Sequence, residues 1–231
     1  KNLNLAHLFS FSLLSFLILL LVLQPDLGQS VLLICTWISL VFVSGANVFY
    51  LSLILTFAIS LFFLLLYLVP EKFSYIVTRL TSFMDPEKSG NFQSQKATEA
   101  IKQGGLKGQG MGEGILKESV PEAHTDYIIA IVSEEFGSVV SILIITIFLF
   151  LAFRIIKKVI NFSSNFYKLS LSGLVSLLIF QTFIHVGVNA NLLPTTGMTL
   201  PFLSYGGSSL LSSGIIAGII LNYTSLRERT E

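Results

Sequence analysis

The sequence predicts an all-α polytopic integral membrane protein with about six transmembrane helices and one large extracytoplasmic loop. Of its 231 residues, 53% are hydrophobic and 12% are charged, whereas soluble domains carry about 25% charged residues. The mean hydropathy is +0.80. The apolar residues gather in runs that approach the ~20 residues needed to cross a bilayer, and one long polar stretch divides these runs into two groups.

The apolar runs predict the individual transmembrane helices. They cover residues 5–23, 28–44, 48–69, 127–153, 169–188 and 206–223. We therefore divide the chain into three transmembrane helices in residues 1–69, an extracytoplasmic loop that bears the site in residues 70–126, and three further helices in residues 127–231. The last part contains a broken segment at residues 192–209.

The polar loop is too poor in apolar residues to form a core of its own. We expect it to lie on the membrane surface, with short helices near residues 75–83 and 92–103. Its glycine-rich run at residues 108–112 follows no strand and lacks the lysine of a P-loop, so it does not predict a nucleotide site. These glycines are better explained by tight turns and close backbone approach.

Basic residues predict the orientation. Arg154, Lys157, Lys158 and Lys168 lie in the connection between the fourth and fifth predicted helices. Cytoplasmic loops of membrane proteins carry an excess of lysine and arginine. This connection is therefore predicted to be cytoplasmic, which places the loop of residues 70–126 outside.

Charge and cysteine content exclude other classes of function. The net charge is +1 without a block of like charges, so no nucleic-acid partner is expected. The single cysteine, Cys35, lies in an apolar run and can form neither an internal disulfide nor a metal cluster. The sequence therefore predicts no metal-ligating residues.

Asp26 lies in the short turn between the first two predicted helices, where Pro25 and Gly28 interrupt the helical pattern. An aspartate at such a turn commonly caps the following helix by accepting a backbone N–H bond. An additional role in binding substrate or anchoring the loop is the alternative.

Glu122, His124, Thr125 and Asp126 close the polar loop just before the fourth predicted helix. The simple interpretation is that Thr125 or Asp126 is the N-cap of this helix. The density of ionisable groups favours a site, because partial removal from water raises the pKa of a carboxyl group and makes it a usable base.

Glu134 and Glu135 follow about 12 Å further along the same helix. Charged groups at that depth normally face a bundle interior or an aqueous cavity. From their angular positions, we expect at most one of the pair to share a cavity with Asp126 and the other to pair with a neighbouring helix.

Gln181, His185 and Asn189 recur every four residues, on one stripe of the fifth predicted helix. Hydrogen bonds to neighbouring helices would explain this stripe, and the lining of a cavity is the alternative. The segment at 193–209 contains prolines and glycines that interrupt any helix, and such backbone is tolerated at membrane depth where it is buried in protein or lines a cavity. This segment, with Ser204 and Ser208, is a second place to expect a ligand.

Four motifs in this chain resemble the SEDS family of FtsW, RodA and SpoVE. They are QPDLG at 24–28, GLKGQGMGEG at 105–114, VPEAHTDYIIAIVSEEFG at 120–137 and LLPTTGMTLPFLSYGGSS at 192–209. The first and last are more similar to FtsW, the division member, than to RodA. Because family members have about ten spans, the resemblance implies the C-terminal part of such a protein.

The resemblance implies a peptidoglycan glycosyltransferase that polymerises lipid II into glycan strands during cell division. It would lie in the bacterial cytoplasmic membrane, with its site on the outer face and its place at the division septum. In the family the aspartate of the PEAHTD motif is essential, which makes Asp126 the catalytic residue here. The residues expected to bind substrate are Asp26, Glu122, His124, Thr125, Lys107, Lys117, Glu134, His185, Ser204 and Ser208.

This chain departs from the family at Thr196, where many FtsW sequences have lysine. If that lysine contacts pyrophosphate, another cation must replace it here, and Lys107 or Lys117 is expected to do so. The sequence does not require a cofactor. It leaves open whether the site binds a divalent cation.

The implied partners are a class B penicillin-binding protein transpeptidase and other divisome membrane proteins. Three alternatives stay open at this point. The first is a lipid II flippase or transporter whose path is lined by Glu134, Glu135 and His185. The second is a RodA-type elongation polymerase, and the third is a noncatalytic scaffold.

Overall fold

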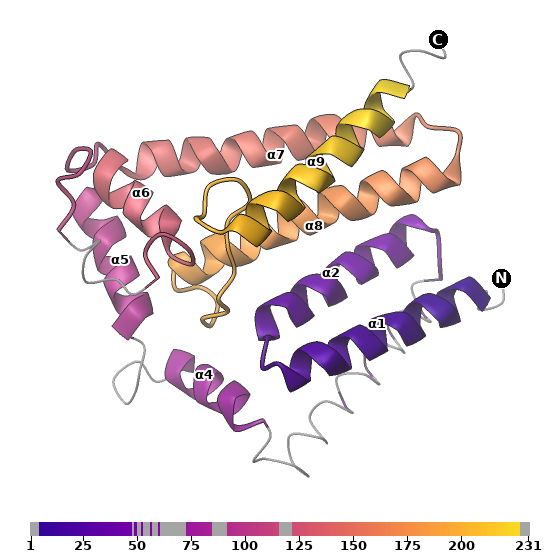
Figure 1. The fold of residues 1–231 in the computed structure, drawn as a ribbon, viewed down its shortest axis with the longest axis horizontal. Coiled ribbons are helices and arrows are strands. Elements are labelled where there is room, and N and C mark those ends of the chain that lie inside the picture. Colours follow the sequence, from indigo (N-terminus) through magenta and orange to yellow (C-terminus); the bar gives the residue numbers. More distant parts are fainter. Residues whose placement is uncertain are drawn as a thin grey trace.

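The computed structural model describes residues 5–47, 49, 52, 56, 60, 73–84, 92–115 and 122–226. Every regular element within these residues is a helix (Figure 1). The helices are α1 (Leu5–Leu23), α2 (Leu27–Val43), α4 (Ser74–Met84), α5 (Phe92–Gly104), α6 (Ile128–Phe136), α7 (Ser138–Ile160), α8 (Asn165–Asn189) and α9 (Gly207–Leu226). The all-α class is confirmed for the described part of the chain.

Most helix bounds agree with the sequence prediction. α1 and α2 match the first two predicted helices to within a residue, and α4 and α5 match the two short helices expected in the polar loop. The third predicted helix, at 48–69, falls almost entirely outside the described residues. The basic residues Arg154, Lys157 and Lys158 belong to the last turns of α7 instead of a loop, because this helix continues to Ile160.

The fourth predicted helix is wrong as a single element. The chain breaks at Gly137, whose φ of 85° and ψ of 165° end α6 and begin α7. A side chain at Gly137 would overlap the backbone of Leu106 in the glycine-rich loop. The break therefore has a tertiary cause that the apolar run at 127–153 does not reveal.

Two helices of the described chain, α7 and α8, are long and apolar enough to cross a membrane, and the apolar stretches Phe9–Leu23 and Leu27–Val43 are shorter. The outer face of α7 exposes large apolar side chains such as Ile142, Leu143 and Phe150. A contiguous apolar face of this kind suits a lipid environment. The number of six spans and the extracytoplasmic position of the loop stay predictions.

α8 forms the centre of the bundle and packs against both α2 and α7 (Figure 1). On the α2 side, the hydroxyls of Ser39 and Ser176 lie 2.6 Å apart, and Gly173 lets the two helices approach because a side chain there would overlap Leu40. α4, α5 and α6 gather at the end of the bundle opposite the α7–α8 connection. That end carries most of the residues predicted to form the site.

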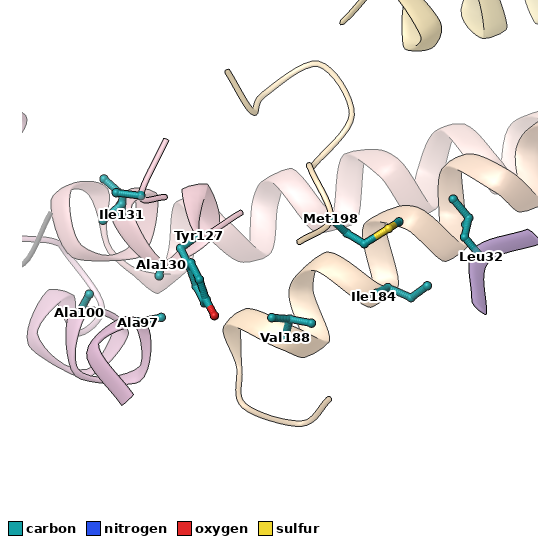
Figure 2. Packing of buried hydrophobic residues seen from close by; sticks show 10 residues of the cluster. Leu32, Ala97, Ala100, Tyr127, Ala130, Ile131, Ile184, Val188 and Met198 are labelled. Atoms are coloured by element: carbon teal, nitrogen blue, oxygen red, sulfur yellow. The ribbon is translucent and has the colours of Figure 1, made fainter. Parts of the chain in front are cut away.

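A compact apolar cluster supports this end of the bundle. Figure 2 shows the small side chains of Ala97 and Ala100 on α5 beside α6, which contributes Ala130 and Ile131. The cluster also includes Leu32, Ala123, Tyr127, Ile184, Val188 and Met198. It joins α2, α5, α6, α8 and the broken segment into one packed unit.

The glycine-rich loop is joined to the α6–α7 break by backbone hydrogen bonds. Gln109 and Gly110 donate their N–H groups to the carbonyl oxygens of Glu134 and Glu135 at 2.9 and 3.0 Å, and Ser138 N–H donates to Gly105 at 2.9 Å. A side chain at Gly108 would overlap the backbone of Glu135. The predicted close backbone approach is confirmed at Gly108, whereas Gly112 lies in open space.

Candidate functional site

Asp126 lies in a tight turn that precedes α6. The carbonyl oxygen of Glu122 accepts hydrogen bonds from the N–H groups of Thr125, Asp126 and Tyr127 at 3.1, 3.0 and 3.3 Å. Glu122 adopts a positive φ of 56° to make this turn, and its carboxylate accepts the hydroxyl of Thr125 at 2.8 Å.

The N-cap interpretation of Thr125 or Asp126 is wrong. α6 begins at Ile128, and its N-cap, Tyr127, makes no side-chain capping bond. The N–H groups that bond back to Glu122 belong to the turn before the helix, and in the first turn of α6 the N–H of Ala130 bonds to Asn189 Oδ1 and to Tyr127 O. The carboxylate of Asp126 is therefore not used to begin the helix.

Three consecutive carbonyl oxygens hold this turn in place. His124 accepts a bond from Tyr205 N–H at 2.9 Å, and Thr125 accepts one from the Ser204 hydroxyl at 2.6 Å. Asp126 accepts one from the side-chain amide of Asn189 at 3.0 Å. All three bonds go to the backbone, so the broken segment and α8 position Asp126 without engaging its carboxylate.

The polar stripe of α8 acts mainly through hydrogen bonds to other segments. Gln181 donates to Thr199 O at 2.9 Å. His185 Nδ1 donates to Met198 O at 2.7 Å, and the ring is fully buried. This bears out the interpretation that the stripe joins neighbouring segments, and it shows that His185 supports the broken segment.

The segment 195–198 passes close to three other parts of the site. Gly197, with a φ of 69°, lies so close that a Cβ there would be 3.5 Å from Asp126 Oδ2. A Cβ at Gly28 would be 2.9 Å from Thr196 O. Arg79 of α4 donates to Thr195 O at 3.3 Å. The broken segment thus contacts α2, α4 and the Asp126 turn.

Burial raises the pKa of the Asp126 carboxyl above its usual range, because the charged form loses water contacts there. The nearby charge of Glu122 raises this pKa further, and the charge of Arg79 opposes both effects. A carboxyl group with a raised pKa is a stronger base once it is ionised. The local environment therefore suits proton abstraction.

Arg79 is the site residue that the sequence analysis did not identify. It is the only basic residue of the short helix predicted at 75–83. That signal marks a candidate, but it does not show that α4 turns this side chain toward residue 195. The contact joins positions 116 residues apart in the chain.

Asp26 is the N-cap of α2, and its Oδ1 accepts the N–H of Gln29 at 3.0 Å. The capping interpretation is confirmed. The carboxylate also acts on the pKa of Tyr75 on α4, which burial raises, Arg79 lowers and Asp26 raises. Asp26 thus lies near the α4 side of the site.

Two of the predicted site residues belong to the contact between the glycine-rich loop and the end of α6. Glu134 has no exposed surface, and its carboxylate lies against Gly114. Lys107 is exposed in the same loop. Lys117 lies outside the described residues. Among the described cations, Arg79 is the one that bonds to the segment carrying Thr196.

A groove with a volume of about 410 Å³ is lined in part by Gly197, the residue whose Cβ position would lie 3.5 Å from Asp126 Oδ2. It lies between α2, α8 and α9, and its walls mix apolar and hydroxyl-bearing side chains. The lining includes Leu32, Leu33, Leu177, Ile216, Gln29, Gln181, Thr199, Ser208, Ser209, Ser212 and Ser213. Ser208 is thus a groove residue, whereas buried Ser204 joins Leu200 N–H to Thr125 O.

Within the described residues, no group of three or more histidine, cysteine, aspartate or glutamate side chains is placed to hold a metal ion. This part of the site consists of carboxylates, one guanidinium, hydroxyls and exposed backbone. Such a set can bind a polar substrate and accept a proton.

The fold and the site define a class: an all-helical protein whose helices suit a membrane and whose acidic site lies at one end of the bundle. The chain belongs to the FtsW, RodA and SpoVE family, because the family model described as "Cell cycle protein" matches residues 2–229.

Named relatives agree with this family. The chain is 36% identical over 206 residues to the probable peptidoglycan glycosyltransferase FtsW of Caulobacter vibrioides, covering 87% of this chain and 51% of the relative. It is 40% identical over 210 residues to the FtsW of Haemophilus ducreyi, covering 87% and 52%. It is also 36% identical over 205 residues to the stage V sporulation protein E of Bacillus subtilis, covering 88% and 56%. The chain thus spans about half the length of these curated relatives.

Two solved structures have a similar fold. One is described as the structural coordination of polymerization and crosslinking by a peptidoglycan synthase complex, with a TM-score of 0.71 and 28% identity over 97% of this chain and 64% of that chain. The other is a mutant of the rod shape determining protein RodA of Thermus thermophilus, with a TM-score of 0.60, 24% identity and coverage of 99% and 60%. The second likeness shows the fold alone.

Proposed function

We propose that the intact protein is a peptidoglycan glycosyltransferase that polymerises lipid II into glycan strands during cell division. The observation that carries this proposal is the Asp126 carboxylate, which caps no helix, lies beside the broken segment and has a raised pKa. Relatives named as probable peptidoglycan glycosyltransferases support the reaction class. Their name FtsW supports the division role over the elongation role.

In the proposed reaction, Asp126 accepts the proton of the 4-hydroxyl group of the acceptor sugar. The acceptor oxygen forms a bond to the anomeric carbon of the donor. The bond between that carbon and the diphosphate oxygen breaks, and the polyprenyl diphosphate leaves with the electron pair. General base catalysis of this kind contributes a factor of about 10² to 10⁴ in rate.

The position of the charges supports a site on the outer face of the membrane. α7 has 23 residues and is about 35 Å long, which exceeds the ~30 Å hydrocarbon core. α6, which follows Asp126 in the chain, lies at the end of the bundle where α7 begins (Figure 1), and Lys157 and Lys158 lie in the last turn of α7. Because basic ends face the cytoplasm, the proposed topology places Asp126 outside.

The groove lined by Gly197 supports a lipid-linked substrate. Its apolar wall from α2 and α8 suits a hydrocarbon chain, and Gly197, one of its lining residues, lies beside the carboxylate of Asp126. A class B penicillin-binding protein is the proposed partner. This proposal is supported by the solved synthase complex, which is described as joining polymerization to crosslinking.

The arrangement of the polar groups gives less support to the alternative function, a lipid II flippase. Of Glu134, Glu135 and His185, the residues expected to line a path, Glu134 and His185 have no exposed surface. The first lies against Gly114, and the second bonds to the backbone of Met198. Both residues therefore serve contacts between segments.

The test uses the intact protein in vesicles with lipid II supplied on the outer side only. Glycan chains separated by gel electrophoresis are the expected product. A membrane-impermeant label should also reach a cysteine placed at exposed Glu113 but not one at exposed Ser163, in a Cys35→Ser background. Movement of lipid II without polymer, or the reverse labelling pattern, would contradict the proposal.

A further inference from the structure

We infer that Tyr75 and Arg79 of α4, together with Thr196 of the broken segment, bind the diphosphate group of the lipid-linked sugar donor. This inference deepens the proposed function and rests on it. It replaces Lys107 and Lys117, the cations expected from the sequence, with an arginine that the structure places at the broken segment.

The first step is the placement of Tyr75 and Arg79. They are four residues apart on α4, so their side chains lie on the same face of the helix. Buried Ile76 fixes this helix against the rest of the protein. Arg79 uses one nitrogen to bond Thr195 O at 3.3 Å. A guanidinium has five N–H donors, so this bond leaves others available for an anion.

The second step is a pair of buried hydroxyls. In the described part of the chain, the hydroxyl oxygens of Tyr75 and Thr196 are buried and have no hydrogen-bond partner. Buried polar atoms are nearly always paired, and an exception calls for an explanation such as an absent ligand. Thr196 directly follows Thr195, whose carbonyl oxygen accepts the Arg79 bond. α4 therefore supplies the Arg79 cation and the Tyr75 hydroxyl, and the adjoining broken segment supplies the Thr196 hydroxyl.

The third step is charge. Asp26, Glu122 and Asp126 all lie at this end of the bundle, and an anionic ligand would be repelled by them. Among the described residues, Arg79 is the cation whose charge acts on both Tyr75 and Asp126. Its planar fork suits two phosphate oxygens at once. We therefore expect diphosphate binding to depend strongly on Arg79.

The experiment measures binding of polyprenyl diphosphate and of the matching polyprenyl alcohol to the intact protein by native mass spectrometry. The variants are Arg79→Gln, Arg79→Lys, Tyr75→Phe and Thr196→Val. The control is Thr78→Val, because Thr78 is exposed on α4 and bonds only its own helix. Thermal unfolding of each variant shows whether it folds.

Arg79→Gln and Tyr75→Phe should each weaken diphosphate binding by about tenfold or more, since hydrogen bonds to charged groups are strong. Thr196→Val should weaken it less, and Arg79→Lys should restore part of the loss. Binding of the alcohol should not change in any folded variant.

Unchanged diphosphate binding in Arg79→Gln and Tyr75→Phe would overturn the inference. An equal loss for the alcohol would also overturn it, because Arg79 would then only hold the 195–198 segment. Neither result would contradict the proposed function, because that function is tested by polymerisation with the unmodified protein.

Discussion

The side-chain amide of Asn189 donates a hydrogen bond to the carbonyl oxygen of Asp126 at 3.0 Å. The same side chain accepts the N–H of Ala130 at 3.1 Å and donates to His185 O at 2.8 Å. Asn189 has no exposed surface. One buried amide thus joins the end of α8 to Asp126, two residues before α6 begins, and to the first turn of α6, and so positions the proposed base.

Replacing Asn189 by leucine should lower both stability and polymerisation. The change leaves the Asp126 carbonyl oxygen without the donor that the amide supplies, at a cost of about 1–3 kcal/mol. It also removes one of the two acceptors of the Ala130 N–H, which keeps its bond to Tyr127 O. Thermal unfolding and glycan synthesis measure the two effects. Asn222→Leu is the matched control, because Asn222 is exposed on α9. An Asn189→Leu protein as stable and active as the control would show that this amide does not position the turn.

Asp126→Asn should fold, insert and bind its penicillin-binding partner but make almost no glycan. Asparagine has nearly the same shape as aspartate, and the bonds that hold this turn go to the backbone. It cannot accept a proton as a base, so a loss of about 10² to 10⁴ in rate is expected. Near-normal polymerisation would reject Asp126 as the base, and Glu122 or Glu134 would become the candidates.

Glu122→Gln should extend activity toward lower pH. Glu122 raises the pKa of Asp126, so removal of its charge lowers that pKa. The base then stays ionised to a lower pH, and the acid limb of the kcat/KM profile moves down. Glutamine retains an oxygen that can accept the Thr125 hydroxyl. An acid limb that stays in place or moves up would show that another group sets it.

Asp26→Asn should preserve the cap of α2. The amide keeps an oxygen for the Gln29 N–H, and asparagine caps about as well as aspartate, so the change should cost about 1 kcal/mol or less. Thermal unfolding checks this expectation. Loss of polymerisation in a protein of normal stability would show that the Asp26 charge has a second role at the site.

Gly104→Ala should destabilise the protein far more than Gly105→Ala. A side chain at Gly104 would overlap the backbone of Ser133 and Glu134, where α5 meets α6. Gly105 has a positive φ of 55°, but the space around it is open, so alanine there adds backbone strain alone. The two neighbouring variants differ mainly in this close approach, and their unfolding temperatures measure it.

Several parts of the fold follow from local signals in the sequence. Apolar runs mark α1, α2 and α8, and Asp26 with its flanking Pro25 marks the turn before α2. The cap at Asp26 is a local interaction within three residues, which is why the sequence alone predicts it.

Other parts depend on contacts between distant residues and could not be predicted in this way. The break at Gly137 interrupts a continuous apolar run, because the loop near Leu106 occupies the space that a side chain would need. The N-cap prediction failed because α6 begins only at Ile128, after a turn in which the N–H groups of Thr125, Asp126 and Tyr127 bond to the Glu122 carbonyl. Arg79 reaches Thr195 across 116 positions, and no local pattern encodes that pairing.

The link between the glycine-rich loop and the α6–α7 break is made by main-chain atoms. Such a link does not depend on which side chains the loop carries. Gly108 and Gly137 are held by the lack of room for a Cβ, whereas the side chains of Leu106, Lys107 and Met111 are exposed. Related sequences should therefore keep the spacing of these two glycines.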